Sequence, residues 1–258
     1  MNAIFLGTNG WFETETGNTV CVLIKSGDYD IVFDAGSGFF KIDKYIDGSR
    51  PVYLFLSHFH MDHISGMHGL SKINCSSGLF IVGQEGTRGI INQLIKKPFT
   101  VPLSELKYKA EVLELPADAG KIPFETEFLP LLHSDPCLGY RIHIDDRIVA
   151  FCTDTGYCDN AVKLGRKADL LITECAFLPG EESKEWPHLN PETAARIALE
   201  AGAKKLVLTH FDAARYLSIE MRINAENTAR EVFPGVSAST DLMSLEIPDS
   251  DASESHTA

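Results

Sequence analysis

The sequence predicts an α/β fold, and three observations support this prediction. Short apolar segments typical of buried strands recur along the chain, and amphipathic helical periodicity follows several of them. The 258 residues are 44% hydrophobic and contain no low-complexity stretch, which suits a globular protein with a large core. Several strand-like segments also end directly on histidine or aspartate, as in α/β folds that gather a site at strand ends. Composition and pattern alone would equally allow a doubly wound α/β domain.

The first half of the chain is rich in strand-like segments. These segments are short, apolar and bounded by polar or glycine-containing turns, and they occupy residues 3–6, 19–25, 29–33, 52–57 and 79–82. Two helices are expected in this half, over residues 41–46 and 85–95, and the second has a broad apolar face.

The second half alternates strands and helices. Strands are predicted at residues 127–132, 139–144, 147–153, 170–173 and 206–209. One helix is expected to begin after Asn190, with Pro191 in its first turn, and to stop near Gly202. Another is expected over residues 219–232. This order suggests two mixed sheets between helices, with a site at one edge.

We expect residues 1–248 to form a single domain and the acidic residues 249–258 to be a disordered tail. No apolar run reaches the roughly 18 residues that a membrane span needs, and the first residues do not resemble a secretory signal. The six cysteines show no C-x-x-C spacing, as expected for reduced thiols in a cytoplasmic protein. The oligomeric state stays open, and a homodimer is one alternative.

A cluster of histidines is the clearest functional signal. His58, His60 and His63, together with Asp62, occupy four of six consecutive positions after an apolar strand-like run. Crowded imidazoles compete for hydrogen-bond partners and repel one another when charged, so a shared cation explains them better than chance does. Imidazole nitrogens and carboxylate oxygens suit Zn²⁺ and similar divalent ions.

Further metal-capable side chains follow three other apolar runs. They are His133, Asp154 and His210. Each alone would more often be a turn residue, but together with the histidine cluster they favour a metal centre at one edge of a layered fold.

These motifs resemble those of the metallo-β-lactamase superfamily. The resemblance rests on the histidine cluster, on the segment Thr153-Asp154-Thr155-Gly156 and on Thr209-His210-Phe211, and it is greatest to the ribonuclease Z and cyclic phosphodiesterase branch. The segment Phe33-Asp34-Ala35-Gly36 matches a further turn of the family, and the likeness covers most of residues 3–247. It implies a four-layer αββα sandwich of two mixed β-sheets flanked by helices.

The resemblance also implies how a dinuclear centre is built. It assigns His58, His60 and His133 to one metal ion and Asp62, His63 and His210 to the other, with Asp154 bridging. Two Zn²⁺ ions are expected, with Mn²⁺ or Fe²⁺ as alternatives. A hydroxide between them would attack phosphorus.

Two residues are expected to be catalytic in this scheme. Asp62 is one, and His188 resembles the family's proton donor. The loop before the helix that starts at Asn190 should lie at the same edge as the strand ends, which independently places His188 beside His210.

Residues around the ligands are assigned more loosely. Asp34 and Asp241 are candidates to accept hydrogen bonds from ligating histidines, with Glu174 and Thr209 as weaker candidates. Arg215 is a candidate donor to a phosphate oxygen. Residues 177–187, with Trp186, are expected to wall the pocket.

Charge is the best guide to the substrate. The chain carries 36 acidic and 23 basic residues, a net charge of −13, whereas a tRNA-processing enzyme needs a basic surface. The family's tRNA-binding arm would lie between His133 and Asp154, but only 154 − 133 = 21 residues separate them. We therefore predict a phosphodiesterase acting on a small cyclic or nucleotide-like diester. The alternatives are a ribonuclease Z-like tRNA 3′ endonuclease, another dinuclear hydrolase of esters, thioesters or lactams, and a non-enzymatic metal-binding protein.

Overall fold

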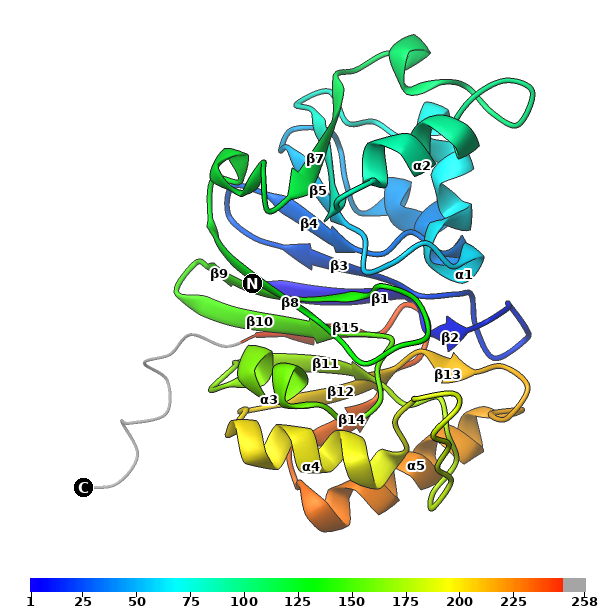
Figure 1. The fold of residues 1–258 in the computed structure, drawn as a ribbon, viewed down its shortest axis with the longest axis vertical. Coiled ribbons are helices and arrows are strands. Elements are labelled where there is room, and N and C mark those ends of the chain that lie inside the picture. Colours follow the sequence, from blue (N-terminus) through cyan, green and yellow to red (C-terminus); the bar gives the residue numbers. More distant parts are fainter. Residues whose placement is uncertain (248–258) are drawn as a thin grey trace.

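Two mixed β-sheets lie face to face in the centre of the molecule, and helices cover their outer faces (Figure 1). A computed structural model describes residues 1–247, so the predicted tail at 249–258 lies outside the described residues. The four layers confirm the predicted αββα sandwich. The chain enters the first sheet, crosses to the second near residue 125, and returns to the first with its last described strand.

The first sheet has seven strands in the order β15-β1-β3-β4-β5-β6-β7. β1, β3 and β4 pair antiparallel, and β4 to β7 pair in parallel. Parallel neighbours place their carboxyl ends at one edge of the sheet. The bounds are β1 Asn2–Gly7, β3 Cys21–Lys25, β4 Asp30–Phe33, β5 Val52–Phe55, β6 Leu79–Gln84, β7 Ala110–Leu115 and β15 Ser244–Glu246.

The second sheet has six strands in the order β14-β12-β11-β10-β9-β8. Four of them are parallel, and β9 and β8 add on antiparallel. The bounds are β8 Glu125–Pro130, β9 Leu138–Ile144, β10 Arg147–Cys152, β11 Leu170–Glu174, β12 Leu206–Thr209 and β14 Val236–Ala238. A short parallel pair, β2 (Asn9–Gly10) with β13 (Phe211–Asp212), connects the two halves of the chain.

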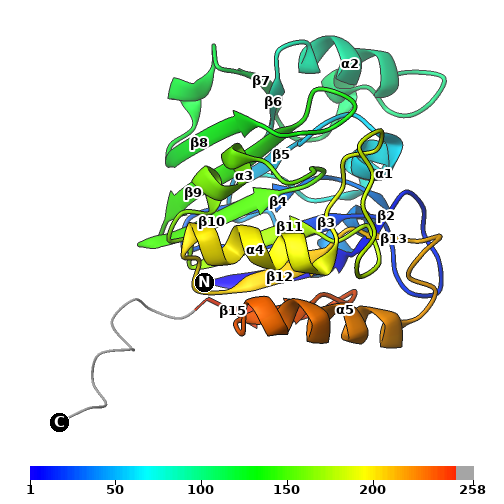
Figure 2. The same ribbon diagram turned by 60° about the horizontal axis from the view of Figure 1, so that its bottom comes forward.

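Helices form the outer layers on both sides. α3 (Asp159–Gly165), α4 (Pro191–Ala201) and α5 (Ile219–Val232) cover the second sheet, as Figure 2 shows most clearly for α4 and α5. α1 (Met61–Ile64), α2 (Thr87–Leu94) and two 3₁₀ helices cover the first sheet. These two 3₁₀ helices span Ser37–Lys44 and Ser65–Lys72, and two shorter ones span Leu103–Glu105 and Ala119–Lys121.

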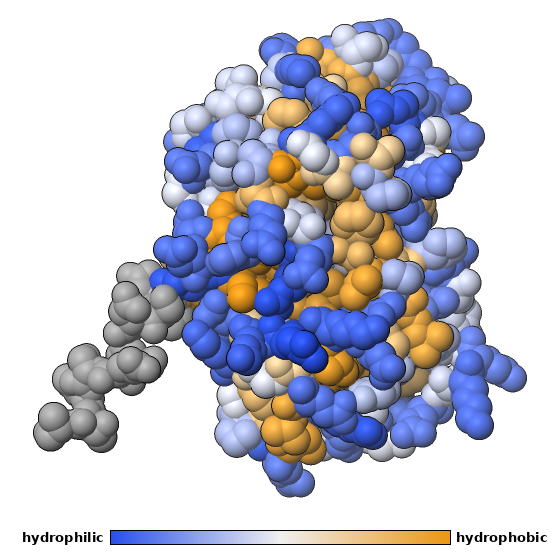
Figure 3. All heavy atoms as spheres, turned by 60° about the vertical axis from the view of Figure 1, so that its left-hand side comes forward, coloured by the Kyte–Doolittle hydropathy of each residue, from blue (hydrophilic) through white to orange (hydrophobic). Residues whose placement is uncertain are grey.

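The core has three apolar layers, as four stacked layers require. The central layer between the sheets is aromatic, with Phe33 stacked on Phe151 at a ring-centroid distance of 4.7 Å. One outer layer packs α3, α4 and α5 onto the second sheet, and the other packs Phe39, Ile91 and their neighbours onto the first. On the side of the molecule shown in Figure 3, polar side chains are mixed with apolar ones, the common pattern of protein surfaces.

Local structure departs from the sequence-based prediction in several places, and two of them are informative. The helix expected over 41–46 is the end of the 3₁₀ helix Ser37–Lys44. β7 was not predicted, because two glutamates interrupt its apolar residues and because the burial of this strand depends on β6 beside it. Within residues 1–247, none of the helices combines the length and apolar character needed to cross a bilayer.

Candidate metal centre

The histidine cluster lies where the first sheet ends. β5 runs through Leu56 and Ser57 into His58, and His60 is the N-cap residue of the short helix α1. Because α1 starts there, Asp62 and His63 project from its first turn rather than along an extended strand. A strand end followed at once by a helix turn therefore brings all four side chains to one edge.

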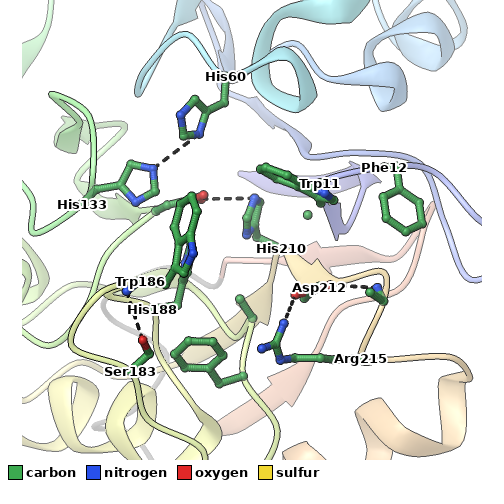
Figure 4. Close-up of a pocket in the computed structure, with 15 residues that line it drawn as sticks. Trp11, Phe12, His60, His133, Ser183, Trp186, His188, His210, Asp212 and Arg215 are labelled. Carbon is green, nitrogen blue, oxygen red and sulfur yellow. Dashed lines mark hydrogen bonds and ion pairs between the residues drawn. The ribbon is translucent and has the colours of Figure 1, made fainter.

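The second sheet contributes the other candidates at the same edge. His133 follows β8, Asp154 follows β10, and His210 lies between β12 and β13. Four sets of three side chains have donor atoms that all lie within 4.8 Å of one another. The sets are His58–His60–His133, His58–His63–Asp154, Asp62–His63–His210 and His133–Asp154–His188. The structure thus brings together all seven side chains predicted as ligands, with His188 beside them. Figure 4 shows His60, His133, His188 and His210 of this group.

Two carboxylate oxygens approach the same pair of imidazole nitrogens. His63 Nε2 and His210 Nε2 are 3.1 Å apart, and Asp62 Oδ2 lies 3.5 Å from the first and 3.3 Å from the second. Asp154 Oδ1 lies 3.5 and 3.2 Å from the same two nitrogens. Ligands of a tetrahedral zinc ion lie roughly 3.3–3.6 Å from one another, given metal–ligand bonds of about 2.0–2.2 Å. The spacings among Asp62, His63 and His210 fit one cation, and Asp154 lies beside this group.

A second group lies on the other side of Asp154. His60 Nδ1 is 3.4 Å from His133 Nε2, and the ring centroid of His58 is 4.9 Å from that of His133. His58 Nε2 and Asp154 Oδ1 are buried and make no hydrogen bond with any described residue. Buried polar atoms nearly always have a partner. A cation bound between these side chains would supply it, so the donor set fits a metal on both sides of Asp154.

The electrostatics of the site require positive charge. Burial alone would lower the pKa of His63, but the carboxylates of Asp62, Asp154 and Asp34 outweigh burial and hold this pKa well above its usual value. Burial lowers the pKa of His58 to about 2, so this imidazole is neutral and free to act as a ligand. Three carboxylates around one imidazole can be balanced by an imidazolium or by a bound cation.

Asp34 lies directly behind the site, as predicted. It is fully buried and accepts a hydrogen bond of 2.8 Å from His63 Nδ1. The backbone N–H and hydroxyl of Ser57 also donate to it, at 2.7 and 2.8 Å. This leaves His63 Nε2 directed at the candidate cation position and fixes the ring.

Two other predicted residues have different partners. Asp241 accepts hydrogen bonds from Thr8, Asn18 and Lys41, and the structure gives it no bond to a histidine of the site, so that expectation is corrected. The expectation overlooked the neighbouring lysine. Arg215 lines the cavity, but its guanidinium pairs with Asp212 and Glu181 and lies over the Phe177 ring. Two carboxylates therefore already balance its charge.

Glu174 has a different role from the one considered for it. It bonds to His188 instead of to a ligand, with His188 Nδ1 donating at 2.7 Å to Glu174 Oε1. Backbone N–H groups of Thr155, Ala176 and Leu189 also donate to its carboxylate. Burial lowers the pKa of His188, but the charge and hydrogen bond of Glu174 outweigh it and raise this pKa to about 9. Glu174 thus favours the imidazolium form of His188 at the wall of the site. The Thr209 hydroxyl is buried without a partner among the described residues.

The loop after β2 is part of the site but was not predicted from the sequence. The backbone N–H of Trp11 donates to Asp62 Oδ2 at 2.7 Å. A Cβ on Gly10 would lie 2.5 Å from the His210 ring, so only glycine allows this approach. Gly10 itself was the available signal, because a glycine within a strand often marks close approach of another group.

A cavity of about 380 Å³ opens above these side chains (Figure 4). His60, His133, His188, His210 and Asp154 form its polar floor. Its walls are largely aromatic, and they are made by Trp11, Phe12, Phe177 and Trp186. Polar groups that can bind a cation thus lie at the base of a pocket with apolar sides.

Comparison with known proteins was made by sequence and by structure. A family profile described as "Beta-lactamase superfamily domain" matches residues 29–211. The "Probable metallo-hydrolase YhfI" of Bacillus subtilis is 31% identical over 242 residues, covering 91% of this chain and 95% of the relative. Ribonuclease Z of Prochlorococcus marinus is 27% identical over 316 residues, covering 96% of this chain and 100% of the relative.

Two crystal structures have a similar fold. The structure of the metallo-β-lactamase fold protein YhfI from Bacillus subtilis superimposes with a TM-score of 0.78 at 27% identity, covering 95% of this chain and 98% of the other. The structure of the short form of human tRNase Z superimposes with a TM-score of 0.74 at 25% identity, covering 96% of this chain and 100% of the other.

Proposed function

This chain belongs to the β-lactamase superfamily, and its relatives include a probable metallo-hydrolase. We propose its function on that premise. The proposal is that it is a phosphodiesterase with two divalent ions, Zn²⁺ first among them, acting on a small diester. The observation that supports it best is that Asp62 and Asp154 both approach the imidazoles of His63 and His210, with spacings of 3.1 to 3.5 Å between each carboxylate oxygen and the two nitrogens and between the nitrogens themselves.

The proposed ligand sets follow from which side chains lie close together. His58, His60 and His133 would hold one ion, Asp62, His63 and His210 the other, and Asp154 lies between the two groups. Bound divalent ions would supply Lewis acidity and lower the pKa of water, the chemistry that hydrolysis at neutral pH needs. Asp34 orients His63, and the Trp11 N–H orients Asp62, so the ligands are held before a cation binds.

His188 is proposed as the proton donor to the leaving alkoxide. Its Nδ1 proton is committed to Glu174, so the ring's other nitrogen is the one available to a substrate. The charge and hydrogen bond of Glu174 raise the pKa of His188 and so favour its imidazolium form. His188 lines the cavity next to His133, at a ring-centroid distance of 5.4 Å. A protonated donor beside the reacting group is what departure of an alkoxide requires.

A small substrate is proposed in preference to tRNA. The alignment with ribonuclease Z spans 316 positions against 258 residues here, so at least 58 positions have no counterpart in this chain. Between His133 and Asp154, the structure contains the β9–β10 hairpin, closed by Asp145 and Asp146 at positive φ. A net charge of −13 adds no basic surface for RNA.

Hydrolysis of bis-p-nitrophenyl phosphate by Zn²⁺- or Mn²⁺-loaded protein tests this function. We expect turnover that Asp154→Ala abolishes without unfolding the protein, whereas the exposed Asp28→Ala leaves it intact. Absence of turnover on any diester at full metal occupancy would overturn the proposal. In that case, ester, thioester and lactam substrates would test the other dinuclear hydrolases, and cleavage of a tRNA precursor at low salt would favour the endonuclease.

A further inference from the structure

The two tryptophans of this chain both lie at the mouth of the cavity. Trp11 is 62% exposed and Trp186 is 50% exposed, and both line the pocket. Large aromatic side chains are expensive to leave in water, and exposed apolar groups beside a polar pocket commonly mark a binding surface. Neither indole has a role in the proposed hydrolysis.

The two indoles meet at a corner. They come from segments far apart in the sequence, yet their ring centroids are 6.5 Å apart with an interplanar angle of 77°. Figure 4 shows them on either side of the approach to His210. A planar ring placed there can stack on the face of one indole and touch the other, both of which are favourable aromatic geometries.

Trp11 is held in position by its backbone. Its φ of 73° is in the left-handed region that non-glycine residues rarely adopt, and its N–H is bonded to Asp62. Such a conformation persists only where the surroundings enforce it, and it often marks a functional site.

Two buried residues fix the loop that carries Trp11. The Asn9 amide donates to Phe12 O, Thr14 Oγ1 and Gly17 O at 3.0 to 3.2 Å. The guanidinium of Arg222 in turn donates to Asn9 and Thr16. The loop is thus ordered before a ligand arrives, which reduces the entropy lost on binding.

The arginine at this rim has its charge balanced by carboxylates. Arg215, the arginine of the cavity wall, is paired with Asp212 and Glu181. The cavity of about 380 Å³ lies at the lower end of the roughly 300–1,000 Å³ that ligand pockets span, so it suits one nucleotide unit.

We propose that Trp11 and Trp186 bind the planar base of a nucleoside phosphodiester by stacking, with the phosphate over the candidate metal ligands. The inference rests on the proposed phosphodiesterase function and narrows its substrate to diesters that carry a nucleobase. Stacking accepts any base, because every base presents a π-face.

Binding of two product-like monoesters to Zn²⁺-loaded protein tests this inference without turnover. AMP and ribose 5-phosphate share the sugar phosphate, but only AMP has a base. We expect AMP to quench the tryptophan fluorescence and to bind roughly tenfold more tightly by calorimetry, whereas ribose 5-phosphate leaves the fluorescence unchanged. Equal affinities with no quenching would overturn the proposal.

Variants of the two tryptophans test whether these side chains bind the base. Trp11→Ala and Trp186→Ala should each weaken AMP binding by roughly fivefold or more, with ribose 5-phosphate unaffected. Phenylalanine at either position should restore most of the affinity, because it retains a stacking face. Phe99→Ala removes an aromatic ring that is 71% exposed but does not line the cavity, so it is the matched control. AMP affinity unchanged in both alanine variants would contradict the inference.

Different results would refute the stacking site and the phosphodiesterase function. If diesters are hydrolysed but the base affects neither KM nor fluorescence, the stacking site is refuted and the phosphodiesterase stands. If AMP quenches the fluorescence through Trp11 and Trp186 but no diester is hydrolysed, the binding site stands and the proposed reaction is refuted.

Discussion

Glu174 illustrates how one buried carboxylate sets the state of a neighbouring histidine. Three backbone N–H groups hold its side chain, so it cannot turn away from His188. It also fixes which ring nitrogen of His188 carries the shared proton. A residue that touches no candidate cation position thereby decides what the proposed proton donor can do.

Replacing His188 tests its role as a donor. His188→Ala should lower diester turnover by about 10²–10⁴-fold, the usual contribution of general acid catalysis, and leave the metal content unchanged. Turnover and elemental analysis of the same sample measure both quantities. His68→Ala, at an exposed histidine outside the site, should change neither. Loss of metal in His188→Ala would instead make His188 a ligand.

The short strands β2 and β13 join the two halves of the chain next to the site. Asn9 pairs with Phe211 and Gly10 with Asp212, so the loop that carries Trp11 and the segment that carries His210 are held in register. Arg222 from α5 lies over the Phe211 ring and bonds to Asn9, which supports this junction from below. The position of His210 thus depends on a contact between distant segments.

A methyl group at Gly10 should disturb this junction. Gly10→Ala places a Cβ 2.5 Å from the His210 ring, so the ring or the backbone at residue 10 must shift and the spacing of His210 from its neighbours changes. We expect about one equivalent of metal to be lost and turnover to fall with it, as measured by elemental analysis and diester hydrolysis. Gly120→Ala meets nothing within 4 Å and should behave as wild type. Full metal occupancy in Gly10→Ala would show that the contact is not needed.

The candidate centre lies between the two sheets of the whole molecule. The cluster around His58 follows the first sheet, whereas His133, Asp154 and His210 follow strands of the second. A cation bound there would connect the two halves, so it would be retained in the folded state and released on unfolding.

Metal removal should therefore lower the thermal stability. At free Zn²⁺ about 100 times its Kd, binding adds about 2.7 kcal/mol, which corresponds to about 5–10 °C in Tm for a chain of this size. Calorimetric scans of chelator-treated and Zn²⁺-reloaded protein measure the difference. An unchanged Tm after verified removal and reloading would argue against a site shared by both sheets.

Thiol reactivity tests the packing of the whole fold. Burial raises the pKa of Cys75 to about 12 and also raises the pKa of the thiols of Cys21, Cys137, Cys152 and Cys175. Cys158 alone among the six is partly exposed. Alkylation of native protein at pH 8 should therefore add one label by mass spectrometry, against six after denaturation. Rapid addition of several labels to native protein would contradict this packing.

Much of the fold follows from local pattern. The helix predicted over 219–232 has those bounds in the structure, and the predicted strands are present with small shifts at their ends. The resemblance to the metallo-β-lactamase superfamily is confirmed. The cytoplasmic location and the homodimer remain predictions. β7 and the 3₁₀ helix Ser37–Lys44 could not be predicted, because neighbouring elements decide their burial and pitch.

The sequence by itself determined which side chains could form the centre, because clustered histidines and apolar runs that end on metal-capable residues are local features. Only the tertiary structure decided which residues surround them. It paired Glu174 with His188, tied Asp241 to Lys41 and set Trp11 beside Trp186. Such partners come from distant segments, and their distances and burial depend on how the sheets pack, which no local pattern encodes.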